Sequence, residues 1–143
     1  MKKTETAVQM LLADIEGKDI LEAACGCAEF SCAAAPYAHS VMCIDLVESR
    51  IKGPLPENVH FEMMDAAAMR WPDETFDAVF LYNAFYHIQP QWEAIEKECR
   101  RVLKPGGKIY LLSLWGLDKA PLIKQYGTAA QQQGDFLIVP IIK

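Results

Sequence analysis

The sequence predicts an α/β fold: a doubly wound, mostly parallel sheet with a final antiparallel strand, in three α/β/α layers. Short apolar runs alternate along the chain with stretches of helical periodicity, the pattern of strand–helix–strand units. Small residues follow the first apolar run, and Asp45 ends the second one about 20 residues later. This spacing is typical of a crevice that binds a nucleoside.

The first half of the chain predicts, in order, a helix, a strand, a helix and two strands: Thr4–Asp14, Asp19–Ala23, Phe30–Ala35, Ser40–Ile44 and His60–Met63. The first helix has Val8 and Leu11 on one face, and the second is rich in alanine. Before the third strand, Gly53-Pro54-Leu55-Pro56 would break a helix, so we expect only about one helical turn near Val47–Ile51.

The second half predicts a strand, a helix, a strand, a weaker helix and a last strand: Phe76–Tyr82, Gln89–Leu103, Lys108–Ser113, Asp118–Gln133 and Phe136–Ile142. Trp92, Ile95 and Cys99 lie on one face of the longer helix, and Gly106-Gly107 is expected to end it. Because Pro140 cannot donate a ladder hydrogen bond, we expect the last strand to be an antiparallel edge beside the fifth.

The turn after the first strand argues against a dinucleotide ligand. A pyrophosphate needs several glycines at such a turn, whereas here Gly26 is flanked by Ala24 and Ala28. The Glu29 carboxylate would also repel a diphosphate at the start of the next helix. S-adenosylmethionine has no phosphate, and Glu22 and Asp45 would suit its ammonium group and its ribose hydroxyls.

Four blocks in this order resemble the motifs of a small class I S-adenosylmethionine-dependent methyltransferase, of the type that includes quinone-biosynthesis enzymes. They are Ile20–Ser31, Cys43–Asp45, Met64–Asp77 and Arg101–Gly107. The resemblance implies a Rossmann-like fold with S-adenosylmethionine as cofactor. It also implies a set of cofactor-binding residues: Glu22, Ala24, Gly26, Asp45, Leu46, Asp65, Ala66 and Tyr82. Asp65 would face the adenine and could also cap a helix over Ala66-Ala67-Ala68.

Catalytic candidates follow the fourth and fifth strands, outside the carboxyl ends where ligands of open α/β sheets bind. His87 and Tyr86 are the two residues proposed for chemistry, because histidine can exchange a proton near neutral pH and the resembled family often has histidine at this position. A helix-capping or core-edge role is the alternative for His87, and simple packing is the alternative for Tyr86 and Phe85. Asn83 and Trp115 complete the expected substrate side.

Composition is that of one globular domain spanning residues 1–143. The net charge of −5 does not favour a nucleic-acid surface, and no apolar run has the length of a membrane span. Neither a nucleic acid nor a membrane is therefore expected as a partner. Met1-Lys2-Lys3-Thr4 is not followed by a signal-peptide core, so a cytoplasmic location is expected.

The five cysteines have no paired spacing, which favours free thiols. Cys25, Cys27 and Cys32 could be read as a soft-metal site, but zinc motifs use tighter pairs and more ligands. Small residues packed in a tight turn are the favoured interpretation, and no metal is expected.

Three functions remain open from sequence alone. The first is methyl transfer to a small-molecule acceptor. The second is a catalytically silent S-adenosylmethionine-binding module that serves a partner protein, and the third, an oxidoreductase domain, is disfavoured by the few glycines. One strand, rather than the two usual in the resembled family, is expected after the fifth. The end of the sheet would then be truncated, and its exposed edge could form a homodimer.

Overall fold

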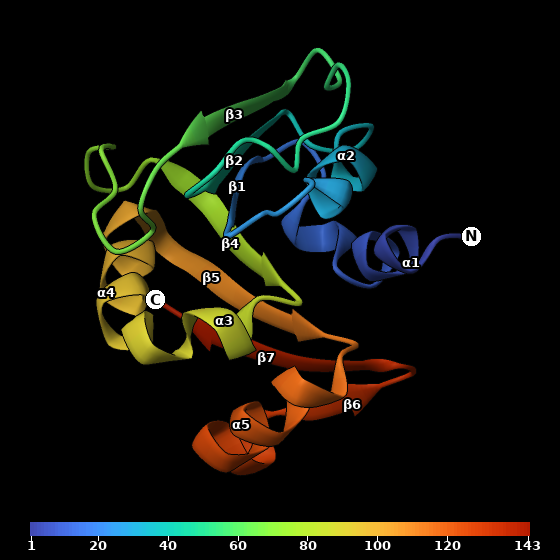
Figure 1. Ribbon diagram of the computed structural model, residues 1–143, viewed down its shortest axis with the longest axis vertical. Helices are drawn as coiled ribbons and strands as arrows, with labels where there is room; N and C mark the ends of the chain where they lie inside the picture. Colours follow the sequence, from blue (N-terminus) through green and yellow to red (C-terminus); the bar gives the residue numbers. More distant parts are fainter.

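One sheet organises the chain, and the computed structural model describes all of its residues, Met1–Lys143 (Figure 1). The sheet has seven strands in the order β3-β2-β1-β4-β5-β7-β6. Their bounds are β1 Asp19–Ala23, β2 Ser40–Asp45, β3 Val59–Met63, β4 Phe76–Tyr82, β5 Leu103–Ser113, β6 Gln131–Gln133 and β7 Phe136–Ile142. β1 to β5 are parallel, and β7 is antiparallel to β5, which confirms the predicted mostly parallel sheet.

Helices cover both faces of this sheet, which confirms the three layers. One face carries α1 (Lys3–Met10) and α2 (Glu29–Ala34); the other carries α3 (Phe85–Ile88), α4 (Trp92–Val102) and α5 (Gly116–Tyr126). Short 3₁₀ turns at Leu12–Asp14, Gln89–Gln91 and Gly127–Ala129 extend or connect these helices. None of the helices combines the length and the apolar character needed to cross a lipid bilayer.

β4 shows why the sheet needs cover on both sides. Its side chains alternate between faces, so Ala78 and Phe80 pack with α1 and α2, while Val79 and Leu81 pack with α4 and α5. All four are at most 1% exposed. A central parallel strand that is apolar on both faces is the expected result of helices on both sides.

The C-terminal end of the sheet differs from the prediction. The helix expected over Asp118–Gln133 ends at Tyr126, and Gln131–Gln133 forms β6, which pairs with β7 across a two-residue turn at Gly134. The sheet therefore does not lack the strand that we expected to be missing. Three consecutive exposed glutamines carry no apolar alternation, so this strand depends on its pairing with β7 and not on a local pattern.

β7 lies beside β5 as predicted, with Leu111 opposite Val139 and Tyr110 opposite Pro140. It is an edge over only part of its length, because β6 pairs with residues Phe136–Ile138. The stretch from Val139 to Ile142 has no strand on its outer side, and the exposed Pro140 falls in this stretch. A proline without an N–H group is tolerated there, as the sequence indicated.

Two further boundaries correct the sequence prediction. α4 ends at Val102 and β5 begins at once at Leu103, so Gly106-Gly107 lies inside the strand and does not end the helix. The register with β4 shifts between Phe76 and Ala78, and a Cβ at Gly107 would lie 2.9 Å from the carbonyl oxygen of Asp77. Glycine is thus required by a close backbone approach at an irregular point of the strand.

The crossover from β2 to β3 contains no helix. Only one hydrogen-bonded turn forms where about one helical turn was expected, with the Ile51 amide donating to the Glu48 carbonyl at 3.0 Å. β3 consequently lacks a covering helix, and Met63 at its end is 54% exposed. The glycine and two prolines of this segment account for the open crossover.

Candidate functional site

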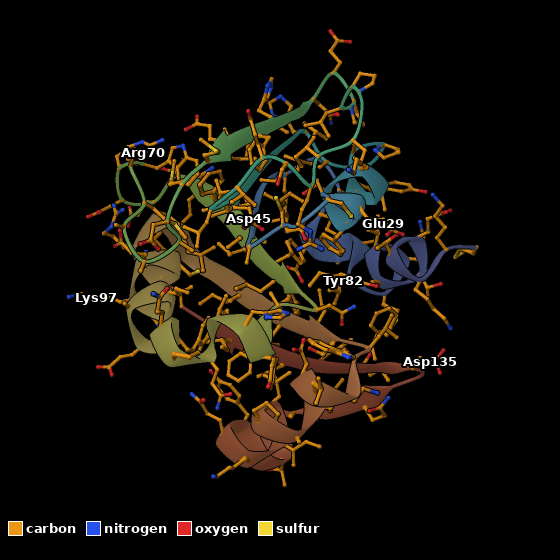
Figure 2. All side chains as sticks on the ribbon, in the orientation of Figure 1. Glu29, Asp45, Arg70, Tyr82, Lys97 and Asp135 are labelled. Atoms are coloured by element: carbon orange, nitrogen blue, oxygen red, sulfur yellow. The ribbon has the colours of Figure 1, made fainter.

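A cavity of about 490 Å³ opens at the carboxyl ends of β1, β2, β3 and β4. Figure 2 shows Asp45 and Tyr82 near the middle of the molecule, whereas Arg70 and Lys97 lie at its periphery. The cavity is lined by all eight residues predicted for cofactor binding: Glu22, Ala24, Gly26, Asp45, Leu46, Asp65, Ala66 and Tyr82. His87 lines it as well, but Tyr86 does not.

The loop after β1 owes its shape to left-handed backbone conformations. Ala24, Gly26 and Ala28 have φ angles of 54°, 57° and 62°. Only glycine adopts this region at no steric cost, so the two alanines carry strain of about 1–2 kcal/mol each. The turn nevertheless brings Gly26 to the cavity and directs the chain into α2.

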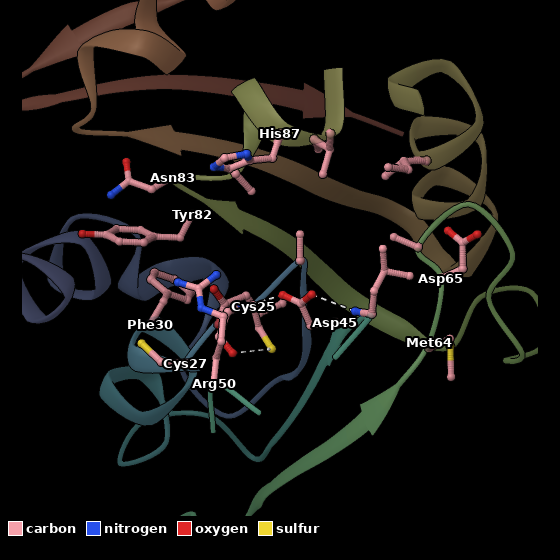
Figure 3. A pocket seen from close by; sticks show the side chains of 18 of the residues that line it. Cys25, Cys27, Phe30, Asp45, Arg50, Met64, Asp65, Tyr82, Asn83 and His87 are labelled. Atoms are coloured by element: carbon pink, nitrogen blue, oxygen red, sulfur yellow. Dashed lines mark hydrogen bonds between the residues drawn. The ribbon is translucent and has the colours of Figure 1, made fainter. Parts of the chain in front are cut away.

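Asp45 ends β2 with its carboxylate held by the backbone. The Gly26 amide donates to one oxygen at 2.7 Å, and the Leu46 amide donates to the other at 2.7 Å (Figure 3). Each oxygen keeps a lone pair for a further donor. The carboxylate is therefore fixed at the cavity wall, ready to accept hydrogen bonds from two ligand hydroxyls.

Glu22 is a buried acid on the same wall. It is 2% exposed, and the Ser31 amide and hydroxyl donate to one of its oxygens at 3.1 and 2.6 Å. Burial raises the pKa of Glu22 to about 8, against the lowering effect of Ser31. The side chain is mostly protonated at neutral pH, and a cation placed beside it would favour its ionised form.

Asp65 follows β3 on the far side of the cavity. Its carboxylate accepts the Ala67 amide at 2.9 Å, and its carbonyl accepts the Ala68 amide at 3.0 Å. These bonds close a turn, so the helix expected over Ala66-Ala67-Ala68 does not form and the helix-capping role predicted for Asp65 is wrong. The carboxylate still lines the cavity.

The end of β4 supplies the third wall. The Tyr82 ring stacks on Phe30 with centroids 5.6 Å apart, and burial raises its pKa to about 12, so the hydroxyl remains protonated. Asn83 takes a φ of 50°, and its side-chain oxygen accepts the amides of Leu114 and Trp115 at 2.7 and 3.3 Å. This bond ties the end of β4 to the end of β5.

An aromatic cluster of Tyr86, His87 and Trp115 adjoins the cavity. The three ring centroids are 5.5 to 5.7 Å apart, and Tyr86 and Trp115 are 47% and 38% exposed. Asp118 fixes the backbone of this cluster to the end of β5. Its buried carboxylate accepts hydrogen bonds from the Tyr86 amide and the Ser113 hydroxyl, both at 2.8 Å. The cluster is thus a rigid, accessible surface that meets the cavity at His87.

Comparison with known proteins identifies the family. The family model described as "Methyltransferase domain" matches residues 21–111, which include most of β1, all of β2 to β4 and every residue that lines the cavity. The chain belongs to the class I S-adenosylmethionine-dependent methyltransferases.

Three relatives illustrate the range of this family. The 27-O-demethylrifamycin SV methyltransferase of Amycolatopsis mediterranei is 30% identical over 89 residues, 62% of this chain and 24% of that protein. The ubiquinone/menaquinone biosynthesis C-methyltransferase UbiE of Hydrogenovibrio crunogenus is 35% identical over 69 residues, 48% of this chain and 27% of that protein. A solved structure from Bacillus halodurans C-125, described as a candidate methyltransferase, superposes with a TM-score of 0.68 at 28% identity and covers 76% of this chain and 50% of that chain. The matched part of the chain thus covers about a quarter of the length of the rifamycin methyltransferase and of UbiE.

The methyltransferase cavity fits S-adenosylmethionine by its chemistry. Glu22, Glu29, Asp45 and Asp65 give it four acidic side chains, which suit a ligand with a sulfonium, an ammonium group and a ribose diol. The loop around Gly26 offers a single glycine and a nearby acid, which are poor features for a pyrophosphate. All five cysteines are free thiols, and no group of three potential metal ligands occurs among the residues.

Several residues that line this methyltransferase cavity were not predicted from the sequence. Ile88, Gln91 and Ile95 line the cavity from α3, the following turn and α4. Their helical spacing was present in the sequence, although it indicates only a common face. Arg50 also lines the cavity, and no local pattern marked it, because it lies in the irregular crossover after β2.

Proposed function

We propose that this chain binds S-adenosylmethionine and transfers its methyl group to a small-molecule acceptor. The observation that carries this proposal is the meeting of the Gly26 loop, Asp45 and Asp65 in one cavity at the carboxyl edge of a parallel sheet. Asp45 would accept the ribose hydroxyls, Asp65 would face the adenine, and Glu22 would face the ammonium group. Ala24, Leu46, Ala66 and Tyr82 would complete the cofactor contacts.

In this reaction the main task of these residues is to position the cofactor and the acceptor. Bound S-adenosylmethionine supplies a methyl group activated by the positive sulfur. The acceptor atom forms a bond to the methyl carbon while the carbon–sulfur bond breaks, and the electron pair of that bond stays on sulfur. Holding the acceptor in line can provide about 7–11 kcal/mol of the barrier reduction. If the acceptor must lose a proton, His87 is the proposed base, with Tyr86 beside it.

The aromatic cluster supports an uncharged acceptor with a flat or apolar part. With centroids 5.5 to 5.7 Å apart, the rings of Tyr86, His87 and Trp115 fill the space between themselves and leave no cage for a bulky cation. Their exposed faces can instead stack on a planar group. Trp115 and Tyr86 are the proposed acceptor surface, and Asn83 fixes the Trp115 backbone.

Calorimetry tests the cofactor, and an acceptor screen tests the reaction. We expect S-adenosylmethionine and its product S-adenosylhomocysteine to bind and NAD not to bind. Transfer of a radiolabelled methyl group to any member of an acceptor library would establish the enzyme. Tight cofactor binding with no transfer to any acceptor class would instead favour the catalytically silent binding module.

The cellular location and the pairing of two copies are also proposals. The five free cysteines support a reducing, cytoplasmic environment. Pairing of two copies through β7 is proposed only for residues 139–142, because β6 covers the remainder of that edge. Lysine substitutions at Leu137 and Val139 would not test this pairing, because both side chains are buried in the core.

A further inference from the structure

Arg50 is an exposed cationic side chain that lines the cavity and has no hydrogen-bond or ion-pair partner in the protein. It lies in the first of two turns between β2 and β3, and Figure 3 shows its guanidinium beside Phe30. A Cβ built on Gly26 would lie 3.1, 3.2 and 3.3 Å from Nη1, Cζ and Nη2 of Arg50. These similar distances mean that the guanidinium plane faces the position that a side chain at Gly26 would occupy. No acidic oxygen lies within the 4.0 Å limit for an ion pair with it.

The charges around Arg50 make this position unusual. It is the one arginine or lysine among the lining residues, which include four acidic side chains. The neighbouring acids already have donors: Asp45 has the two backbone amides, Glu22 has Ser31, and Glu29 has the Thr4 hydroxyl at 3.3 Å. The guanidinium therefore keeps all five N–H donors available to a ligand in a cavity otherwise suited to cations.

The ligand proposed above has one anionic group. S-adenosylmethionine carries a carboxylate on the same carbon as its ammonium, and this carbon must lie near Glu22 if that acid meets the ammonium. Glu22 and Arg50 both line the cavity beside the Gly26 loop. A guanidinium can bind a carboxylate through two parallel hydrogen bonds, which an ammonium side chain cannot reproduce.

We infer that Arg50 binds the carboxylate of the cofactor and makes the site selective for nucleosides that carry an intact amino acid. This inference rests on the proposed cofactor. It also gives Gly26 a second purpose, since any side chain there would displace the guanidinium as well as strain the backbone at a φ of 57°.

Two ligands separate the carboxylate from the remainder of the cofactor. S-adenosylhomocysteine carries the complete amino acid, and its decarboxylated analogue keeps the adenosine, the sulfur and the amine. Calorimetry would compare both ligands on the wild type, Arg50→Gln and Arg50→Lys. Arg70→Gln is the matched control, because Arg70 is exposed, pairs with Glu62 at 3.3 Å and does not line the cavity.

We expect Arg50→Gln to weaken S-adenosylhomocysteine on the order of tenfold or more and to change the affinity for the decarboxylated analogue less than twofold. Arg50→Lys should recover part of the loss, and Arg70→Gln should match the wild type. Equal weakening of both ligands by Arg50→Gln would overturn the inference. Tighter binding of both would also overturn it, because it would show that the guanidinium competes with the cofactor.

The same titrations distinguish the failure of the inference from the failure of the proposed function. If the wild type binds neither nucleoside, both the cofactor assignment and the role of Arg50 are wrong. If the wild type binds S-adenosylhomocysteine and the two ligands respond alike to the substitution, only the role of Arg50 is wrong. The Arg50 side chain makes no hydrogen bond, so its substitutions should leave the fold intact. Thermal unfolding of each variant checks this.

Discussion

The Gly26 amide donates to the Asp45 carboxylate at 2.7 Å and joins the loop after β1 to the end of β2. The bond fixes the one acid that faces the cavity from β2, while the Leu46 amide fixes its second oxygen. The backbone of the loop after β1 thus positions the cavity-lining side chain at the end of β2. This arrangement depends on the left-handed turn at Gly26 and cannot be made by side chains alone.

The first prediction concerns Asp45→Asn, which keeps the shape of the side chain and removes its charge. We expect affinity for S-adenosylhomocysteine to fall at least about tenfold, because the ribose hydroxyls lose a charged acceptor. The variant should also unfold at a slightly lower temperature, since the new NH₂ group must face one of two backbone N–H donors. Calorimetry and thermal unfolding measure the two effects.

Glu57→Gln is the control for this change, because Glu57 is exposed in the turn before β3 and lies outside the cavity. It removes the same charge from the opposite end of the crossover and should leave cofactor affinity unchanged. Unaltered binding in Asp45→Asn would show that the ribose assignment is wrong.

Local signals explain what the sequence could predict. Apolar runs bounded by turns located six of the seven strands, and the small-residue turn with its following acids predicted residues that line the cavity, because each signal lies within a few residues. β6 escaped prediction because Gln131–Gln133 is defined only by its pairing with β7. Arg50 escaped because no local pattern distinguishes it from other exposed charged residues of the crossover, and its approach to Gly26 depends on the path of that crossover.

The second prediction uses the strained alanines of the loop. Ala24→Gly should raise the free energy of unfolding by about 0.5 kcal/mol, because relief of the left-handed strain exceeds the entropy cost of glycine. Ala28→Gly should be nearly neutral, because Ala28 is fully buried and its methyl group would be lost from the core. Chemical denaturation measures both changes.

Ala23→Gly, one residue before this loop, provides the comparison. Ala23 is buried at the end of β1 and does not have a positive φ, so the substitution should destabilise by about 1 kcal/mol or more. A stabilising Ala23→Gly, or a clearly destabilising Ala24→Gly, would contradict the assignment of strain to the left-handed positions.

The third prediction is a pH dependence caused by Glu22. Its pKa is raised from 4.5 to about 8, so between these values the folded protein holds a proton that the unfolded chain has lost. The contribution of Glu22 to the free energy of unfolding therefore falls as pH rises from about 4.5 to about 8, by at most about 1.4 kcal/mol per pH unit. The isosteric Glu22→Gln lacks this titration, so its stability relative to the wild type should increase over that range.

Thermal unfolding of both proteins at pH 5, 6, 7 and 8 gives the comparison. Parallel curves would mean that Glu22 is already ionised in the folded protein. A ligand ammonium would favour the ionised acid, so we also expect wild-type cofactor affinity to rise toward pH 8 and binding to release a proton. Calorimetry in two buffers with different ionisation enthalpies measures that release.

The fourth prediction concerns the open part of β7. We expect light scattering to detect at most weak self-association, because the outer side of β7 is open only over residues 139–142 and Pro140 has no N–H to offer. Ile142→Lys adds charge at a side chain that is 65% exposed and should abolish such pairing without touching the core. A stable dimer that survives this substitution would place the interface on another surface.

The last prediction concerns His87, the proposed base. His87→Ala should reduce methyl transfer by at most a few hundred-fold, because alignment of the acceptor provides most of the rate enhancement and a base adds about 10²–10⁴-fold. Binding of S-adenosylhomocysteine should change little. His60→Ala, an exposed position on β3, should leave both quantities unchanged. Complete loss of transfer with intact cofactor binding would mean that proton removal, and not alignment, limits the reaction, whereas no loss would assign His87 to the aromatic surface alone.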